Sequence, residues 1–468
     1  MDKQDLKEYF NKISSERDKW KKRNKYYHKD LERFFRYIVP DGSSVLEIGC
    51  ATGDVLASLT PPKGLGIDFS EKMIELAKEK HPQFEFQVMD AENIGLGEKY
   101  DYIILSDLIG FLKDIEKVFK ELHKVSHSKS RIVITYYNFL WSPILKLAEK
   151  FGLAMSQPWQ NWLNKADIKN LFYLSGFEVV KEGERFIFPK YIPIFSSLIN
   201  RYLAKLPILR KFCLINYIIA RPVLKTDFSE PSVSIVIPAR NEAGNIEAAV
   251  KRVPRMGSHT EIIFIEGHSQ DNTFDEIKRC KDKYPDKDIK LFKQTGKGKA
   301  DAVRIGFDRA SGDILMILDA DLTVLPEDLP KFYDALMSGK GEFINGSRLV
   351  YPLEKDSMRF LNILGNKFFS LVFTWLLDQK IKDTLCGTKV LWKKDYEKIK
   401  EGRKFFGDFD PFGDFDLLFG AAKLNLKIID LPIRYQERKY GTIQISRFSH
   451  GWLLLKMCAF AMRKIKFI

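Results

Sequence analysis

Two acidic residues separated by one position follow a short apolar run in the second half of the chain. Residues 312–321 read GDILMILDAD, so a stretch of strand length delivers Asp319 and Asp321 to its carboxyl end. Carboxylate oxygens are preferred ligands of Mg²⁺ and Mn²⁺, which also bind diphosphate oxygens. The spacing therefore predicts a divalent-cation site, at which the metal would neutralise a leaving nucleoside diphosphate.

Polar groups at three other places accompany these acids. The apolar strand SIVIPARNE (234–242) ends in a polar turn, and the strand EIIFIE (261–266) ends in an acid. The loop GKGK (296–299) opens a helix, where backbone amides and lysines can meet a phosphate. The residues expected to contact a nucleotide-linked donor are Pro238, Arg240, Glu242, Glu266, Lys297 and Asp319.

The first half of the chain contains a small-residue turn after an apolar strand. Residues 45–54 read VLEIGCATGD, where Gly49 and Gly53 let the backbone approach a ligand closely. Asp68 ends the next apolar run, and an acid there can accept hydrogen bonds from ribose hydroxyls. Asp90 follows the third run, within reach of an adenine amino group. The pattern predicts a site for a nucleoside-containing cofactor.

Short apolar runs alternate with amphipathic stretches on both sides of a proline-containing polar segment, RPVLKTDFSEPS (221–232). This alternation predicts two α/β domains, the first with a doubly wound parallel sheet. We expect a domain at 1–222, a linker at 223–231 and a domain at 232–468. The expected strands are Val45–Ile48, Gly64–Ile67, Phe84–Val88, Tyr102–Leu105, Ile132–Thr135, Val233–Ile237, Glu261–Ile265, Ile289–Phe292 and Ile314–Leu318, with amphipathic helices at Glu71–Lys80 and Ile115–Lys124.

From about Phe10 to Phe188 the chain resembles class I S-adenosylmethionine-dependent methyltransferases. The resemblance implies a Rossmann-like fold, S-adenosyl-L-methionine as cofactor, and cofactor contacts from Glu47, Gly49, Gly53, Asp68 and Asp90. Ala51 stands where the family has its middle glycine. An NAD-binding domain is the alternative, but the E-x-G-x-x-x-G form favours the methyl donor. Methyl transfer depends chiefly on alignment of the acceptor, so no general base is assigned.

From about Val233 onward the chain resembles family 2 glycosyltransferases of the GT-A fold, and among them the dolichyl- and polyprenyl-phosphate mannose synthases. Gly346–Arg348 (GSR) resembles the segment that holds the lipid phosphate, and Arg359 a second arginine that contacts it. Asp383–Gly387 stands where those enzymes have D-x-x-S-G, and Arg438 lies in a segment resembling the one that closes over the donor diphosphate. The resemblance implies a nucleotide-sugar donor and a polyprenyl phosphate or other lipid-linked acceptor.

Two segments depart from that family. Where the family has two acids after the second strand, this chain has Glu266 and Gly267, followed by His268. The family's later acidic motif appears here as a tandem repeat, FGDFDPFGDFD (406–416). Inverting transfer usually needs a base near the acceptor hydroxyl, whereas a phosphate acceptor is already ionised. Asp414 and Asp416 are the candidates for such a catalytic role, and the sequence does not choose between them.

Composition limits the partners. The chain has 468 residues and a net charge of +14, which suits two domains and phosphate-bearing or anionic-lipid partners. No nucleic-acid-binding motif accompanies the charge, so nucleic acid is not an expected partner. The five scattered cysteines contain no C-x-x-C pair, which indicates neither a zinc site nor a disulfide framework and fits a cytoplasmic location.

Three apolar, basic segments raise the question of membrane contact. Leu361–Leu377 and Gly451–Ile468 either lie on an anionic membrane surface or pack into the core, and Phe186–Ala220 either caps the first sheet or faces lipid. No stretch of 18 uninterrupted apolar residues occurs, so we expect peripheral attachment to the inner face of the cytoplasmic membrane.

The sequence thus predicts a bifunctional enzyme, with methyl transfer in the first half and metal-dependent, inverting glycosyl transfer in the second. Two alternatives stay open. The second half is a nucleotidyltransferase that releases pyrophosphate, or one half is a binding module without activity.

Overall fold

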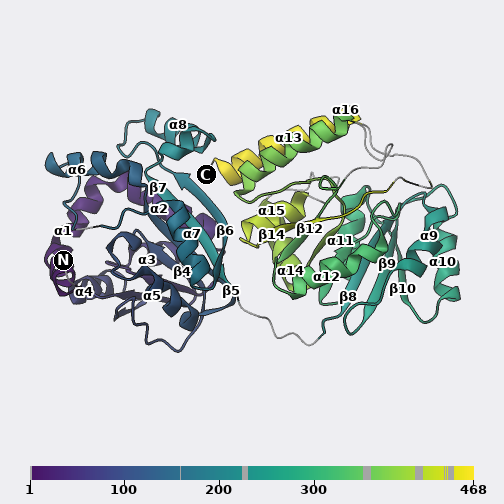
Figure 1. Ribbon diagram of the computed structural model, residues 1–468, viewed down its shortest axis with the longest axis horizontal. Helices are drawn as coiled ribbons and strands as arrows, with labels where there is room; N and C mark the ends of the chain where they lie inside the picture. Colours follow the sequence, from purple (N-terminus) through teal and green to yellow (C-terminus); the bar gives the residue numbers. More distant parts are fainter. Residues whose placement is uncertain are drawn as a thin grey trace. The chain divides into compact units, whose positions relative to one another are not determined.

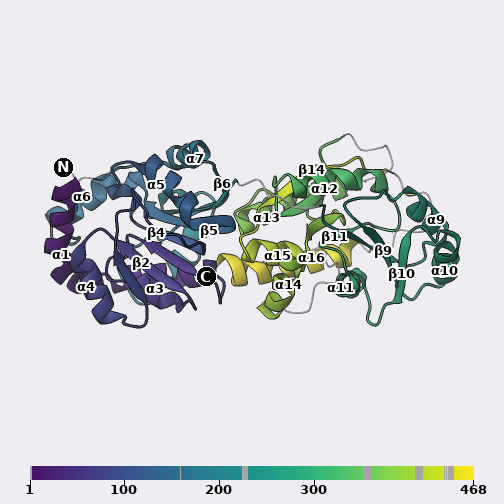
Figure 2. The same cartoon turned by 90° about the horizontal axis from the view of Figure 1, so that it is seen from below.

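The computed structural model describes residues 3–158, 160–223, 230–351, 360–405, 415–436, 438, 440 and 447–467. The chain divides into two compact units, Met1–Leu224 with Phe467–Ile468, and Lys225–Lys466 (Figures 1 and 2). Most of the expected linker, together with Arg359 and Asp414, lies outside the described residues.

The first unit is built on a seven-stranded sheet in the order β3-β2-β1-β4-β5-β7-β6. The first five strands of this order are parallel, and β7 runs antiparallel to both of its neighbours. The predicted doubly wound α/β fold is confirmed, with the first strand near the centre of the sheet. The strands are β1 Val45–Ile48, β2 Gly64–Asp68, β3 Glu85–Val88, β4 Tyr100–Ser106, β5 Ser126–Tyr137, β6 Phe177–Arg185 and β7 Ile215–Pro222.

Helices cover both faces of this sheet. On one face α5 and α7 pack through Phe119 and Phe172, whose rings stack 4.1 Å apart, and on the other α2, α3 and α4 pack through residues such as Phe35. The helix α5 is shorter than the predicted stretch, because a 3₁₀ turn follows it at Leu122–Val125. The helices are α1 Lys3–Arg23, α2 Lys25–Ile38, α3 Asp54–Leu59, α4 Glu71–Lys80, α5 Ile115–Glu121, α6 Ser142–Lys150, α7 Lys165–Leu174 and α8 Phe195–Arg201.

The second unit has its own seven-stranded sheet, in the order β10-β9-β8-β11-β13-β12-β14. Strands β10, β9, β8 and β11 are parallel, whereas β13 is antiparallel to both β11 and β12. The four strands predicted here are those of the parallel part. The strands are β8 Val233–Ala239, β9 Thr260–Glu266, β10 Asp288–Lys293, β11 Ile314–Ile317, β12 Phe343–Ser347, β13 Lys389–Trp392 and β14 Ile428–Pro432.

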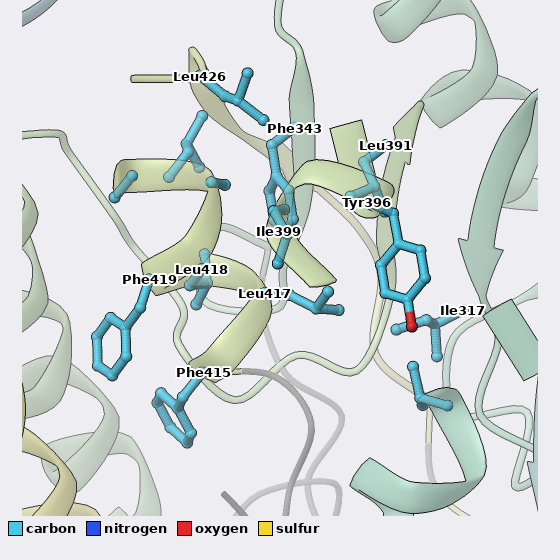
Figure 3. Packing of buried hydrophobic residues seen from close by; sticks show 14 of the residues in the cluster. Ile317, Phe343, Leu391, Tyr396, Ile399, Phe415, Leu417, Leu418, Phe419 and Leu426 are labelled. Atoms are coloured by element: carbon cyan, nitrogen blue, oxygen red, sulfur yellow. The ribbon is translucent and has the colours of Figure 1, made fainter. Parts of the chain in front are cut away.

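Aromatic and aliphatic side chains from several helices fill the core of this unit. Figure 3 shows Phe415 and Phe419 of α15, with Tyr396 of α14, gathered near the strand residues Phe343 and Leu391. The helices are α9 Ala243–Arg252, α10 Thr273–Lys283, α11 Lys299–Arg309, α12 Leu329–Met337, α13 Phe360–Leu377, α14 Lys393–Gly402, α15 Phe415–Lys423 and α16 Arg447–Ala461.

The two apolar helices of the second unit, α13 and α16, pack into the core on one side only. Each buries one face in the core, through Phe373 in α13 and Met457 in α16, and each leaves large apolar side chains exposed. The exposed ones are Leu364, Phe368 and Leu371 in α13, and Trp452 and Leu455 in α16. Among the described residues, no helix is both long and apolar enough to cross a bilayer.

Candidate functional sites

A cavity of about 680 Å³ lies at the carboxyl ends of the parallel strands in the first unit. Glu47 within β1, Gly49 just after it, Asp68 at the end of β2, and Asp90 after β3 all line it. Its volume falls within the range of small-molecule and cofactor pockets. Four of the five residues expected to bind the cofactor are therefore brought to one cavity.

The turn after β1 uses left-handed backbone at three positions. Gly49, Ala51 and Gly53 have φ of +71°, +47° and +74°, a region that favours glycine. Gly53 does not line the cavity; a Cβ there would lie 2.5 Å from the ring of Phe86. Gly53 thus allows the turn to pack against β3, while Gly49 and Ala51 face the cavity.

Buried acids surround this turn. Asp68 accepts hydrogen bonds from the amides of Ala51 and Ser70, both at 2.9 Å, and burial raises the pKa of Asp68. Glu47 accepts one from the amide of Leu56 at 2.9 Å, and burial raises the pKa of Glu47 to about 8. These bonds fix the turn and the acids together, so the cavity wall is preformed.

Helix α1 contributes side chains that the sequence reasoning missed. Lys3 forms ion pairs with Asp90 and, at 3.0 Å, with Glu92, while Arg17 and Trp20 also line the cavity. The Nε atom of Arg17 is buried and has no hydrogen-bond partner among the described residues. The Lys- and Arg-rich stripe of α1 was the available signal, but nothing local indicated which sheet edge it would cover.

A second unassigned group lies where β4 ends. Asp107 has a φ of +53°, unusual for a non-glycine residue, and accepts hydrogen bonds from the Tyr27 hydroxyl and, at 2.8 Å, from Thr135 Oγ1. Burial raises the pKa of Asp107, and burial lowers that of nearby His28 to about 3, with Lys21 adding to the effect. Asp107, Tyr27 and His28 all line the cavity.

The residues present fit S-adenosyl-L-methionine. The cavity combines a left-handed turn that exposes backbone, acids after β2 and β3 for hydroxyl and amino groups, and a buried guanidinium nitrogen without a partner. That guanidinium matches the one anionic group of this cofactor, its carboxylate.

In the second unit Asp319 and Asp321 follow β11, at the carboxyl edge of the parallel strands. Asp319 pairs with Lys299, the first residue of α11, at 2.6 Å. Burial alone would raise the pKa of Asp319, but Lys299 and the more distant Lys389 and Arg348 lower it below its usual value. Asp319 is thus held ionised, as a metal ligand must be.

One arginine links two of the predicted donor-site acids. Arg438 donates to Asp321 at 2.7 Å and to Glu242 at 2.9 Å. Asp321 also accepts hydrogen bonds from the amide and hydroxyl of Thr323. Three segments far apart in sequence therefore meet around Asp321.

The other predicted donor contacts occupy the same edge but differ in setting. Glu266 is buried and accepts a hydrogen bond from the amide of Ser269, whereas Arg240 and Lys297 are exposed. Pro238 lies within β8 and is partly buried. Of the two lysines in the loop before α11, Lys299 rather than Lys297 reaches the acids.

Two predicted catalytic residues are engaged in buried ion pairs. Arg348 donates two hydrogen bonds of 2.8 Å to the carboxylate of Asp383, and its guanidinium lies over the ring of Tyr435. Asp416 accepts hydrogen bonds from Arg304 and lies 3.4 Å from Arg403, and its side chain is only 5% exposed. Burial raises the pKa of Asp416, and the two arginines oppose that effect.

The fit of a divalent cation rests on Asp319 and Asp321. Two adjacent carboxylates suit Mg²⁺ or Mn²⁺ when diphosphate oxygens complete the coordination. Lys299 and Arg438 neutralise these carboxylates in the structure, so charge compensation is already part of the site. Within the described ranges, no set of three or more His, Cys, Asp or Glu side chains is arranged to hold a metal.

Both halves match families of known proteins. The family described as "Methyltransferase domain" matches residues 20–182, and the family described as "Glycosyl transferase family 2" matches residues 234–400. The chain therefore carries a methyltransferase domain followed by a family 2 glycosyltransferase domain, and its second sheet is GT-A-like.

Among curated relatives, dolichol-phosphate mannosyltransferase of Pyrococcus furiosus is 34% identical over 214 residues, which cover 45% of this chain and 58% of the relative. The hexosyltransferase Agl6 of Haloferax volcanii is 26% identical, covering 47% and 52%. Polyprenol monophosphomannose synthase of Mycolicibacterium smegmatis is 24% identical, covering 49% and 86%. The chain spans about half the length of the first two.

Solved structures similar to each half are known. A methyltransferase from Thermotoga maritima, described as a possible histamine N-methyltransferase, is 15% identical with a TM-score of 0.37, covering 46% of this chain and 99% of that one. Glucosyl-3-phosphoglycerate synthase from Mycobacterium tuberculosis is also 15% identical with a TM-score of 0.37, covering 50% and 80%.

Proposed function

We propose that the second unit transfers a sugar, with inversion, from a nucleotide-diphosphate sugar to a polyprenyl phosphate or another lipid-linked acceptor. The observation that carries this proposal is the meeting of Asp319, Asp321, Lys299, Arg438 and Glu242 at one sheet edge. The printed names of the Pyrococcus and Mycolicibacterium relatives support the acceptor class.

Each of these residues has a role in that reaction. Asp319 and Asp321 would hold Mg²⁺ or Mn²⁺, which neutralises charge on the departing nucleoside diphosphate. Arg438 and Lys299 would bind diphosphate oxygens of the donor, and Glu242 keeps Arg438 in place. Fixed cations at the leaving group stabilise the charge that develops there.

Arg348 is the described residue that would bind the phosphate of the acceptor. Arg359 and Asp414, which are also expected at the acceptor, lie outside the described residues. Arg348 is oriented by Asp383 and Tyr435, so its remaining N–H groups have a fixed direction toward a phosphate. Because an acceptor phosphate is ionised at neutral pH, the site needs orienting cations more than a base. Asp416, paired with Arg304, acts in this scheme by positioning that arginine.

Release of nucleoside diphosphate tests this proposal. The purified chain is incubated with GDP- and UDP-sugars, Mg²⁺ or Mn²⁺, and a short polyprenyl phosphate. We expect metal-dependent release that the lipid stimulates and that Asp321→Asn reduces at least about 100-fold. The matched control is Asp313→Asn, an exposed acid at the opposite end of β11, which should keep full activity. Release of pyrophosphate instead would favour a nucleotidyltransferase.

For the first unit we propose S-adenosyl-L-methionine-dependent methylation of a small molecule, sugar or lipid. Asp68 and Asp90 bind the adenosine, and Arg17 binds the carboxylate of the cofactor. When bound, the cofactor supplies the electrophilic methyl group. Asp107, which follows β4, and Tyr27 of α2 form a polar part of the cavity wall and orient a hydroxyl or amino acceptor.

Peripheral attachment of the second unit to the cytoplasmic face of a membrane completes the proposal. The exposed side chains of α13 and α16, Leu371 and Trp452 among them, would enter the headgroup region, while Lys456 and Arg463 meet anionic lipid. Such attachment brings a lipid-linked acceptor within reach of the glycosyl-transfer site.

A further inference from the structure

The first unit exposes large apolar side chains on two segments that also contribute residues to the lining of its cavity. On α6 and the turn after it, Ile144, Leu147 and Phe151 are more than half exposed. On residues 194–212, which include α8, the side chains of Ile194, Ile208 and Phe212 are also more than half exposed. These six residues define what we call the apolar surface. Ile194 is 84% exposed and has a φ of +65°, which is unfavourable for a β-branched residue.

The two segments are neighbours in space. The indole nitrogen of Trp141, just before α6, donates to the carbonyl of Phe212 at 2.9 Å, and Asn138 donates to the carbonyl of Lys211 at 3.0 Å. Figure 1 shows α6 and α8 on the same side of the first unit. The two parts of the apolar surface are therefore held against each other where residues 138–141 meet residues 211–212.

The same segments wall the cavity. Leu145 and Ala148, on the inner side of α6, line it, and so do Pro189 and Lys190 just before α8. Helix α6 has no buried residue at all, although Ile144 and Leu147 on its outer side are apolar. A helix with apolar residues on both sides, one toward a cavity and one outward, requires a second partner for the outer side.

Charge identifies that partner. Residues 186–223 contain no acid, and their exposed basic residues are Lys190, Arg201 and Lys211, while residues 139–153 contain two lysines and one glutamate. Lys146, Lys150, Lys190 and Lys211 are exposed beside the apolar side chains. A second copy of the chain would bring lysines against lysines in a two-fold contact, which repels. Apolar side chains ringed by lysines suit the headgroup region of an anionic bilayer.

We infer that the apolar surface docks the methyltransferase unit onto an anionic lipid bilayer, which places the segments that wall the cavity at the headgroups. Only the consequence, that the methyl acceptor arrives from the lipid surface, rests on the proposed methyl transfer. The docking is measured by binding to lipid vesicles, so its test does not depend on methyl transfer or on glycosyl transfer.

Vesicle flotation of the full chain tests the docking. The surface variant carries Phe151→Ser, Ile194→Ser and Ile208→Ser, and a charge variant carries Lys150→Gln, Lys190→Gln and Lys211→Gln. Against phosphatidylcholine vesicles with about one third phosphatidylglycerol, we expect the surface variant to partition at least about tenfold more weakly than the wild type. In the charge variant, each lysine that is replaced should weaken vesicle binding about fivefold. In 1 M NaCl, the vesicle binding of the wild type should also weaken, because salt screens the attraction between lysines and anionic lipid.

Two control variants make the result interpretable. Tyr173→Ser with Leu174→Ser removes equally exposed apolar side chains from α7, away from the apolar surface, and should float like the wild type. Trp452→Ser with Leu455→Ser tests α16 in the second unit. Unchanged melting temperatures establish that the variants fold. The inference is overturned if the surface variant binds vesicles like the wild type, or if sedimentation shows a wild-type dimer that this variant dissociates.

Discussion

Gly387 lies directly behind the proposed metal ligands, and replacing it with alanine should disable glycosyl transfer without unfolding the protein. A Cβ at this position would lie 2.7 Å from Asp319 Cγ, and still closer to one carboxylate oxygen and to Lys299 Nζ. Since carbon atoms pack at about 3.5–4.0 Å, the Asp319 side chain would have to move by roughly 1 Å. No positive φ is involved, so the effect is one of space alone.

A displacement of roughly 1 Å in a reacting site lowers rates by about 100-fold. Initial rates of nucleoside diphosphate release, measured over a range of Mn²⁺ concentrations, should show this loss together with a weaker metal dependence. Gly365→Ala in α13 is the matched control, because a Cβ there meets nothing within 4 Å, and its rate should equal that of the wild type. A Gly387→Ala enzyme that is folded and fully active would refute the placement of Asp319 in the site.

Three further outcomes follow from buried charges. Arg17→Gln should weaken S-adenosyl-L-methionine binding about tenfold in calorimetry but leave 5′-methylthioadenosine, which lacks the carboxylate, unaffected; equal losses for both ligands would exclude the carboxylate contact. Burial raises the pKa of Glu47 from 4.5 to about 8. Between these two pH values the folded state keeps a proton that the unfolded state has released, so the stability of the fold falls as the pH rises from 4.5 to about 8. Without cofactor, the free energy of unfolding of Glu47→Gln should therefore rise by about 3 kcal/mol relative to that of the wild type between pH 6 and pH 9. Parallel pH profiles of the two proteins in thermal unfolding would contradict this. Asp383→Asn, which leaves Arg348 buried without its carboxylate, should destabilise the second unit by about 3–5 kcal/mol in denaturant unfolding, whereas Glu327→Gln, in an exposed pair with Arg252, should cost less than about 1 kcal/mol; equal losses would mean that burial does not decide the difference.

Local sequence was enough to predict the elements that carry the sites. An apolar run followed by acids or glycines specifies a buried strand and its polar end, which is why Asp319, Asp321, Gly49 and Asp68 lie where the sequence placed them. In a parallel sheet those ends share one edge, so the approximate positions of both sites follow as well.

Contacts between distant segments were beyond the reach of local patterns. The position of α1 along the cavity depends on ion pairs such as Lys3 with Asp90, 87 positions apart in the numbering, and the basic sequence around Arg17 does not indicate which sheet edge it faces. Likewise, Lys297 and Lys299 are alike in sequence, and only the register of α11 brings Lys299 to Asp319. The pairing of Asp416 with Arg304 is equally long-range.

Helix α13 shows a different limit. Its sequence is apolar on nearly all sides, so periodicity does not separate a core helix from a surface one. The structure resolves this by burying Phe373 and exposing Leu371, two positions apart and hence on opposite sides of the helix.

The central claim, transfer of a sugar to a polyprenyl phosphate, is tested most directly by mass spectrometry of the lipid product. The full chain is incubated with the donor sugar nucleotide found above, Mg²⁺ or Mn²⁺, and a short polyprenyl phosphate, and the organic phase is analysed. We expect a species heavier than the acceptor by one sugar residue, formed only with metal and absent with Asp321→Asn. Nucleoside diphosphate release without any such lipid product would contradict the acceptor assignment.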